Sequence, residues 1–149
     1  MTATENRLTK KKVLACGEKI HDLELSTFES VDEDAFTALS PLKHYLNLSG
    51  ITSMSESTAT VFSKHPGILQ LDGLTEISDS CAEILAKKKG GLWLNGLKTL
   101  SNEAAVALAQ HDADLYLSGL TKLSPAASKI LSKPNIFFAK GQVKVSVGS

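Results

Sequence analysis

Leu92-Trp93-Leu94-Asn95-Gly96-Leu97 is the stretch that decides the fold of this chain, because the same hexapeptide returns at a fixed interval. Three further copies of the pattern Leu-x-Leu-x-Gly, each followed by Leu or Ile, occupy residues 46–51, 69–74 and 115–120. Neighbouring copies begin 23 residues apart, and residues 23–28 form a fifth copy in which the glycine is missing. A fixed period of this length predicts a repeat architecture built from one supersecondary unit.

The residues that follow each hexapeptide recur with the same period. The third residue after it is always apolar: Val31, Met54, Ile77, Leu100 and Leu123. The next residue is of a type that caps helix N-termini: Asp32, Ser55, Ser78, Ser101 and Ser124. An apolar column follows seven residues later: Leu39, Phe62, Leu85, Leu108 and Leu131. Each unit is therefore predicted to contain a short strand, a glycine turn and a helix of about three turns that begins at the capping residue.

One such unit cannot bury its own apolar face, whereas stacked units can. The sequence therefore predicts a single-domain α/β solenoid, with parallel strands on the concave face and short helices on the convex face. Strands are expected near residues 23–25, 46–48, 69–71, 92–94 and 115–117. The recurring glycines are expected to take positive φ values where the chain turns inward: Gly50, Gly73, Gly96 and Gly119.

The period divides the chain into three parts. Residues 23–136 form five repeats, residues 1–22 an N-terminal cap or degenerate repeat, and residues 137–149 a C-terminal cap of one or two strands. A degenerate repeat is favoured at the N-terminus because Cys16 lies 23 residues before Leu39. At the C-terminus, Phe137-Phe138 matches the strand if the spacing shortens to 22, and the alternating Val143, Val145 and Val147 predict a further strand.

The pattern Leu-x-Leu-x-Gly-Leu-x-x-Leu-Ser, repeated every 23 residues, resembles a leucine-rich repeat of a bacterial variant type. The resemblance covers about residues 20–141 and implies a scaffold that binds protein on its concave strand face, usually without catalysis. One column departs from the common family pattern, which has Asn or Cys directly after the strand. That column is apolar here: Phe28, Ile51, Leu74, Leu97 and Leu120. We therefore expect the polar ladder of the family to be missing.

Composition excludes several classes of protein. The 149 residues contain 16 Lys and Arg against 16 Asp and Glu, and a net charge of zero argues against a general nucleic-acid binder. The 42% hydrophobic content suffices for a core, yet no run of about 18 apolar residues predicts a membrane span. The N-terminus lacks the apolar run of a signal peptide, so we expect a cytoplasmic protein. We also expect it to be a monomer. A secreted or cell-surface location is the alternative if the sequence has been trimmed.

Neither the histidines nor the cysteines predict a reactive site. His65 and His111 lie two repeats apart, too far to share a metal ion, and all four histidines, His21 and His44 included, are expected on the surface. The two cysteines are expected to be small core residues. No phosphate-binding loop or nucleophile motif is present. We therefore expect a protein without enzymatic activity, cofactor or metal.

The candidate site comes from the strand positions that should face outward on the concave side. Their first column changes from polar residues to aromatic ones along the chain, and the predicted partner-binding residues are Trp93, Tyr116, Gln70, Asp72, Asn95, Asn47 and Phe138. Aromatic residues supply a large contact area at low entropic cost, which favours recognition. Two alternatives stay open: the C-terminal tail covers this column, or the rings stack on each other and stiffen the sheet.

The sequence thus predicts a noncatalytic scaffold for protein–protein interaction. The first alternative is a module that binds carbohydrate or a small ligand, with Trp93 and Tyr116 as stacking platforms and Asn95 and Asp72 as polar partners. A purely structural domain of a larger assembly is a third class, and it needs no site.

Overall fold

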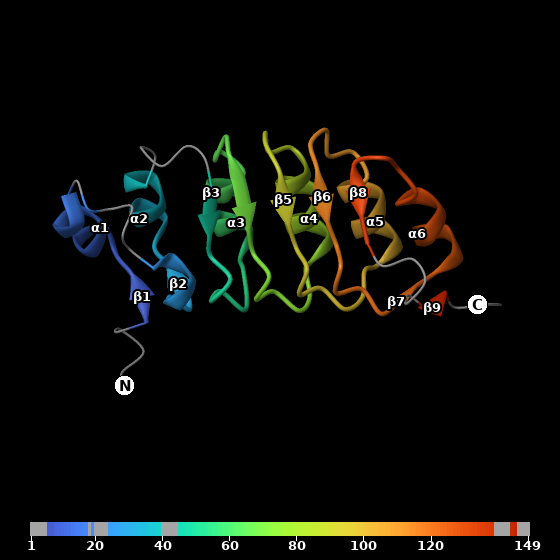
Figure 1. The fold of residues 1–149 in the computed structure, drawn as a ribbon, viewed down its shortest axis with the longest axis horizontal. Helices are drawn as coiled ribbons and strands as arrows, with labels where there is room; N and C mark the ends of the chain where they lie inside the picture. Colours follow the sequence, from blue (N-terminus) through green and yellow to red (C-terminus); the bar gives the residue numbers. More distant parts are fainter. Residues whose placement is uncertain (1–5, 18, 20–23, 40–44, 139–143, 146–149) are drawn as a thin grey trace.

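The computed structural model describes residues 6–17, 19, 24–39, 45–138 and 144–145 (Figure 1). Within them the chain is an α/β protein whose main sheet is wholly parallel. The strands lie in front in Figure 1 and the helices behind, and successive units follow one another along the long axis of the molecule. The predicted α/β class with parallel strands is therefore confirmed.

The main sheet has five strands in the order β3-β4-β5-β6-β8. Their bounds are β3 Tyr45–Asn47, β4 Ile68–Gln70, β5 Leu92–Trp93, β6 Leu115–Tyr116 and β8 Ile136–Phe137. The first of the two leucines of each hexapeptide pairs with its equivalent in the next unit, as Leu69 does with Leu92 and Leu92 with Leu115. The 23-residue period of the sequence is therefore the register of the sheet from β3 to β6.

Helices follow the strands and begin where the capping residues predict. Their bounds are α2 Glu33–Ala38, α3 Glu56–Phe62, α4 Asp79–Ala86, α5 Asn102–Leu108 and α6 Pro125–Ile130. The N-cap serines of α3 to α6 each accept a hydrogen bond from the backbone N–H three residues later, as Ser78 does from Cys81 at 3.1 Å. Asp32 at the start of α2 makes no such bond and instead forms an ion pair with Arg7. At six to eight residues, these helices have about two turns rather than the expected three.

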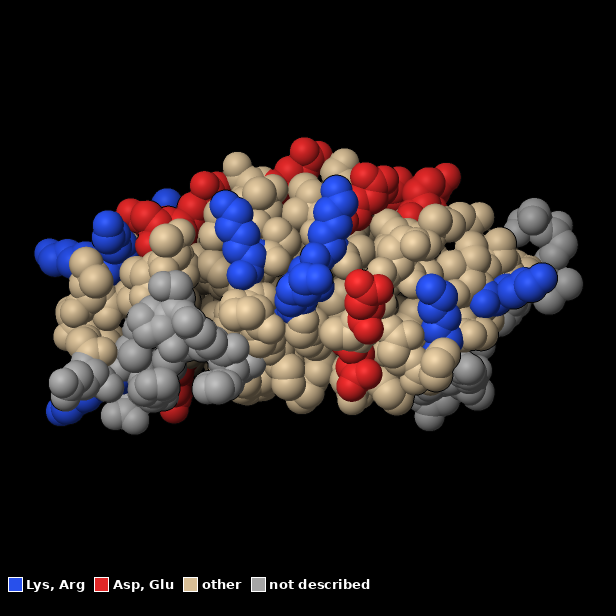
Figure 2. Space-filling model, turned by 90° about the horizontal axis from the view of Figure 1, so that it is seen from above, with Lys and Arg blue, Asp and Glu red and all other residues tan. Residues whose placement is uncertain are grey.

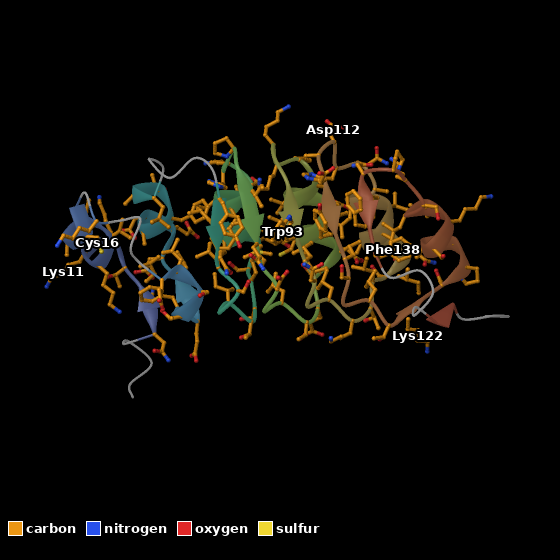
Figure 3. All side chains as sticks on the ribbon, viewed as in Figure 1. Lys11, Cys16, Trp93, Asp112, Lys122 and Phe138 are labelled. Carbon is orange, nitrogen blue, oxygen red and sulfur yellow. The ribbon has the colours of Figure 1, made fainter. Side chains whose placement is uncertain are left out.

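The core lies between the sheet and the helices. Both leucines of every Leu-x-Leu motif from Leu46 to Leu117 are at most 1% exposed. The helices face them with alanines such as Ala82 and Ala105, which are fully buried and allow close approach to the sheet. Cys81 is buried in the same layer, as expected, while Cys16 is partly buried, and both are free thiols. Figure 3 shows Cys16 on the first helix, at the left end of the molecule.

The first expected strand is not formed by its described residues. Leu25–Thr27 is instead a short 3-10 helix, η2, in which the Thr27 hydroxyl donates to the Glu24 carbonyl oxygen at 2.7 Å. That bond closes a tight turn, in which Thr27 occupies the position of the glycine in the later units. Leu25 and Phe28 nevertheless stay buried, so this unit keeps its core positions without contributing a described strand. Residue 23 lies outside the described part of the chain.

The recurring glycines do not have the expected backbone conformation. Positive φ among the described residues occurs at Gly17 and Gly90, and at none of the glycines of the repeat. The glycine requirement comes instead from close approach between units. A Cβ atom on Gly96 would lie 1.9 Å from the backbone oxygen of Asp72, and one on Gly119 would lie 1.8 Å from that of Asn95. Only glycine allows the backbones of neighbouring turns to touch in this way.

Two small parallel pairs flank the main sheet. At the N-terminal end, β1 (Arg7–Leu8) pairs with β2 (Ser30–Val31), and α1 (Lys10–Cys16) begins at Thr9, whose hydroxyl accepts from the Lys12 N–H. Leu8 pairs with Val31 at the 23-residue spacing, which favours a degenerate repeat over an unrelated capping helix. At the other end, β9 (Lys144–Val145) pairs with β7 (Lys122–Leu123) rather than with the main sheet. Val143 and Val147 lie outside the described residues.

Candidate binding face

The face of the main sheet that carries no helices is lined by alternate residues of its strands. In β3, Leu46 points into the core and is buried, so Tyr45 and Asn47 point to the other side. The same alternation gives the other outward positions: Ile68, Gln70, Gly91, Trp93, Asp114, Tyr116 and Phe137. Trp93, Tyr116, Gln70 and Asn47 are partly exposed, and Figure 3 shows Trp93 in front of the middle strands. The structure therefore places these four predicted site residues on one face.

Phe138 is not part of this outward column. Tyr116 pairs with Phe137, so the spacing shortens to 21 rather than 22, and Phe138 packs against the core at the end of β8 (Figure 3). The cause is the shorter loop after α6: Ile136 lies five positions after Leu131, whereas Leu115 lies seven positions after the equivalent Leu108. The exposed aromatic residue at this end of the face is therefore Phe137. Lys140, the outward neighbour expected beside Phe138, lies outside the described residues.

Four aromatic rings form a continuous row across the face, which we call the aromatic row: Tyr45, Trp93, Tyr116 and Phe137. The ring centroids of Tyr45 and Trp93 are 5.7 Å apart, and those of Trp93 and Tyr116 are 5.3 Å apart at an angle of 63°. Tyr116 and Phe137 stack at 4.7 Å and 18°. The outer members remain open to solvent, with 46% of Tyr45 and 40% of Phe137 exposed. Ring contacts therefore order the row without burying it.

The column directly after the strands is apolar and buried, as expected, but a polar ladder of another kind exists two residues before it. The carboxylate oxygen Oδ1 of Asp72 accepts from the Asn95 backbone N–H at 2.9 Å, and Oδ1 of Asn95 accepts from the Ser118 N–H at the same distance. The Ser49 hydroxyl accepts from the Asp72 N–H at 3.3 Å. Each side chain thus binds the backbone of the next unit. Asp72 and Asn95, both predicted to contact a partner, have one oxygen each committed to holding the units together.

A second network ties the aromatic row to this ladder. The Tyr45 hydroxyl donates to Oε1 of Gln70, and the Gln70 amide donates to Oδ2 of Asp72. Partial burial, and then the negative charge of Asp72, raise the pKa of Tyr45 above its ordinary value. The Asn47 side chain binds the backbone that follows it, since its Oδ1 accepts from the Ser49 N–H at 3.1 Å. The polar half of the predicted site is therefore largely satisfied internally.

A hollow of about 400 Å³ opens beside the aromatic row, and we call it the Gly91 hollow. Its lining residues come from three neighbouring strands and the loops before them: Ile68, Gly91, Trp93, Ala113, Asp114 and Tyr116. The sequence analysis missed Gly91 and Asp114, along with Tyr45 and Phe137. The alternation of strand positions carries the signal for Tyr45 and Asp114, because each lies two residues before an outward residue already selected.

Two of the histidines contradict the expected surface location. His65 and His111 are 4% and 2% exposed, and with Lys88 they form a buried polar column at the 23-residue spacing. The Lys88 ammonium donates to the carbonyl oxygens of Gly67 and Lys89, and the two ring nitrogens of His111 lie 3.2 and 3.1 Å from those of Ala86 and Gly90. Lys88 and His111 therefore contact backbone carbonyl oxygens between the units, which sequence spacing alone does not reveal. His21 and His44 lie outside the described residues.

His65 makes stability depend on pH. Burial, and then the charge of Lys88, lower the pKa of His65 to about 4, although its hydrogen bond to the Ile68 backbone opposes the shift. The unfolded chain, with a histidine pKa near 6.5, binds this proton more readily than the folded chain. The neutral His65 therefore contributes fully to the free energy of unfolding above pH ~6.5. This contribution, about 2–3 kcal/mol, is lost as the pH decreases towards about 4. Urea unfolding between pH 7 and 4 should show this loss, and His65→Leu should flatten it. If the free energy of unfolding of His65→Leu fell equally between pH 7 and 4, His65 would not be the cause of the loss.

Seen from above, most of the visible Asp and Glu side chains lie along one long edge of the molecule, while Lys and Arg lie mostly across the middle and at the ends of this view (Figure 2). Within the described residues, no helix has the length and apolar character needed to cross a membrane, and no group of three or more His, Cys, Asp or Glu side chains is placed to hold a metal ion.

Comparisons of the chain with protein-family models, curated proteins and solved structures give no match. The function of this chain is therefore inferred from the geometry of its helix-free face.

Proposed function

We propose that this chain is a solenoid of the leucine-rich-repeat type that binds a protein partner on its concave strand face and catalyses no reaction. The register of 23 residues from β3 to β6 supports the repeat assignment, since each of these units adds one strand and one helix in the same relation. Stacked repeats of this kind create extended surfaces on which successive units each contribute contacts.

The observation that carries the binding role is the exposed aromatic row. Aromatic side chains are concentrated in protein interfaces because they bury a large apolar area and lose few rotamers. Only eight aromatic residues occur in the chain, and four of them meet in this row. The described part of the C-terminal tail, Lys144–Val145, pairs with β7 and leaves the row uncovered. A row needed only to stiffen the sheet gains nothing from the exposure of Tyr45 and Phe137.

The carbohydrate-binding alternative is less well supported. A sugar site needs polar side chains that are free to bind hydroxyl groups beside the stacking ring. Asp72 and Asn95 were the expected polar partners, but each binds the backbone of the next unit. One face of Tyr116 is also covered by Phe137, which leaves less ring surface for a sugar.

Trp93→Ala tests the proposed function. The partner recovered with the immobilised chain should bind the variant about 30-fold more weakly, which corresponds to about 2 kcal/mol for a central aromatic anchor. The free energy of unfolding should fall by only about 1–2 kcal/mol, because the ring is partly exposed and loses two ring contacts. Affinity is measured by calorimetry with the purified partner.

Val106→Ala is the matched control, because Val106 is a 47% exposed apolar residue on α5, on the helix side of the molecule. It should leave affinity unchanged. Equal affinities for both variants would overturn the proposed binding face. Fluorescence of Trp93, the single tryptophan, gives an independent check, since a blue emission protected from quenchers in the isolated protein would mean that the row is covered.

A further inference from the structure

The Gly91 hollow owes its existence to a missing side chain. Gly91 stands in the outward column between Ile68 and Asp114, and adjacent strands are about 4.8 Å apart. Its φ is not positive, and a Cβ atom would lie 3.3 Å from Cγ1 of the Ile68 side chain and 3.7 Å, an ordinary contact distance, from the Asp114 backbone oxygen. Backbone geometry therefore does not require glycine here, in contrast to the glycines of the repeat. The space left open is bounded by the rings of Trp93 and Tyr116.

Asp114 gives this hollow a free negative charge. Its side chain is exposed, and within the described residues its carboxylate has no ion-pair or hydrogen-bond partner. Asp72, the other acid on this face, uses one oxygen for the Asn95 N–H and the other for the Gln70 amide. No lysine or arginine occupies an outward position of the described main-sheet strands, so nothing on these strands neutralises Asp114.

A carboxylate beside two aromatic rings is a site for a cation. The rings of Trp93 and Tyr116 are inclined at 63°, so they meet edge to face rather than in a closed stack, and both residues line the hollow. Tryptophan and tyrosine attract cations through the negative potential of the ring face. A guanidinium group adds planar stacking on the ring and paired N–H donors that match a carboxylate, neither of which an ammonium group offers.

We propose that the Gly91 hollow binds an arginine side chain from a basic segment of the protein partner. The guanidinium stacks against Trp93 and Tyr116 and donates to the Asp114 carboxylate. This inference rests on the proposed function, because it names the chemistry of the partner for the same face. The negative charge of Asp114 and the absence of basic outward residues make the face complementary to such a segment.

The test uses the full chain and the acetylated, amidated peptide Gly-Arg-Gly-Arg-Gly-Arg-Gly, followed by the emission of Trp93. Saturable binding should weaken with added salt and should be lost with the citrulline peptide, a neutral near-isostere of the arginine peptide. Asp114→Asn should weaken binding about tenfold, the loss expected for one charge-assisted contact. Gly91→Leu fills the hollow and should abolish binding, with thermal unfolding recorded to confirm that this variant folds.

Asp112→Asn is the matched control for Asp114→Asn, since Asp112 is an exposed acid two residues earlier, and Figure 3 places it in the loop above β6, away from Trp93. Equal binding by the two variants, or equal binding of the citrulline peptide, would overturn the arginine site. The proposed function is read separately from the recovered partner. A partner that is sensitive to Trp93→Ala but not to Asp114→Asn would leave the binding face standing and refute only the arginine inference.

Discussion

Replacing Gly96 with alanine is expected to destabilise the fold by about 3 kcal/mol or more, because the new methyl group would clash with the backbone of the preceding unit. Its carbon would lie 1.9 Å from the Asp72 backbone oxygen and 2.6 Å from that of Leu74. Both neighbours are backbone atoms of the preceding unit, so relief requires the two units to move apart. That movement would also stretch the bond between the Asn95 N–H and Asp72.

Gly91→Ala is the control for this experiment. Gly91 lies five residues earlier. The atom nearest to a Cβ atom there would be Cγ1 of the flexible Ile68 side chain, at 3.3 Å. We expect a change of less than about 1 kcal/mol, since the side chain yields more easily than backbone. The free energies of unfolding in urea give the comparison. Equal values for the two variants would show that the spacing between units is not held by close backbone approach.

Leu94→Ala is expected to cost about 2–5 kcal/mol of stability. Leu94 is fully buried in the middle unit, between Leu71 and Leu117 of the neighbouring units, which are equally buried. Truncation leaves a cavity that stacked units on both sides cannot easily fill, because each is held by its own pairing with the sheet.

Urea unfolding of Leu94→Ala should be compared with that of Val106→Ala, which removes apolar carbons from an exposed site. The control should change stability by about 0.5 kcal/mol or less. A loss below about 1 kcal/mol for Leu94→Ala would mean that the middle of the stack repacks around the change, and that the core is less rigid than its burial indicates.

Only part of the candidate site could be predicted from the sequence. Alternation along the strands correctly placed Trp93 and Tyr116 on the helix-free face, because side-chain direction follows from the two-residue period of a strand. The same rule applied to Phe138 gave the wrong residue, since it depends on the length of the preceding loop. The assignment of Asp72 and Asn95 to a partner meets a different difficulty, because one oxygen of each already accepts from the backbone of the next unit. A polar outward residue has the same sequence signature whether it binds a ligand or a neighbouring backbone.

The sequence by itself determined the period, the parallel register and the helix starts at residues such as Ser78 and Ser101. Those features depend on local chemistry and on a residue spacing that can be counted in the sequence. Only the tertiary structure decided why Gly96 must be glycine, that Lys88 and His111 are buried, and that Gly91 opens a hollow beside Asp114. Each of these features depends on atoms about 20 to 25 residues away in the sequence. Side chains of one unit bind backbone carbonyl groups of the adjacent unit, and close approach of the two backbones leaves no room for a Cβ atom.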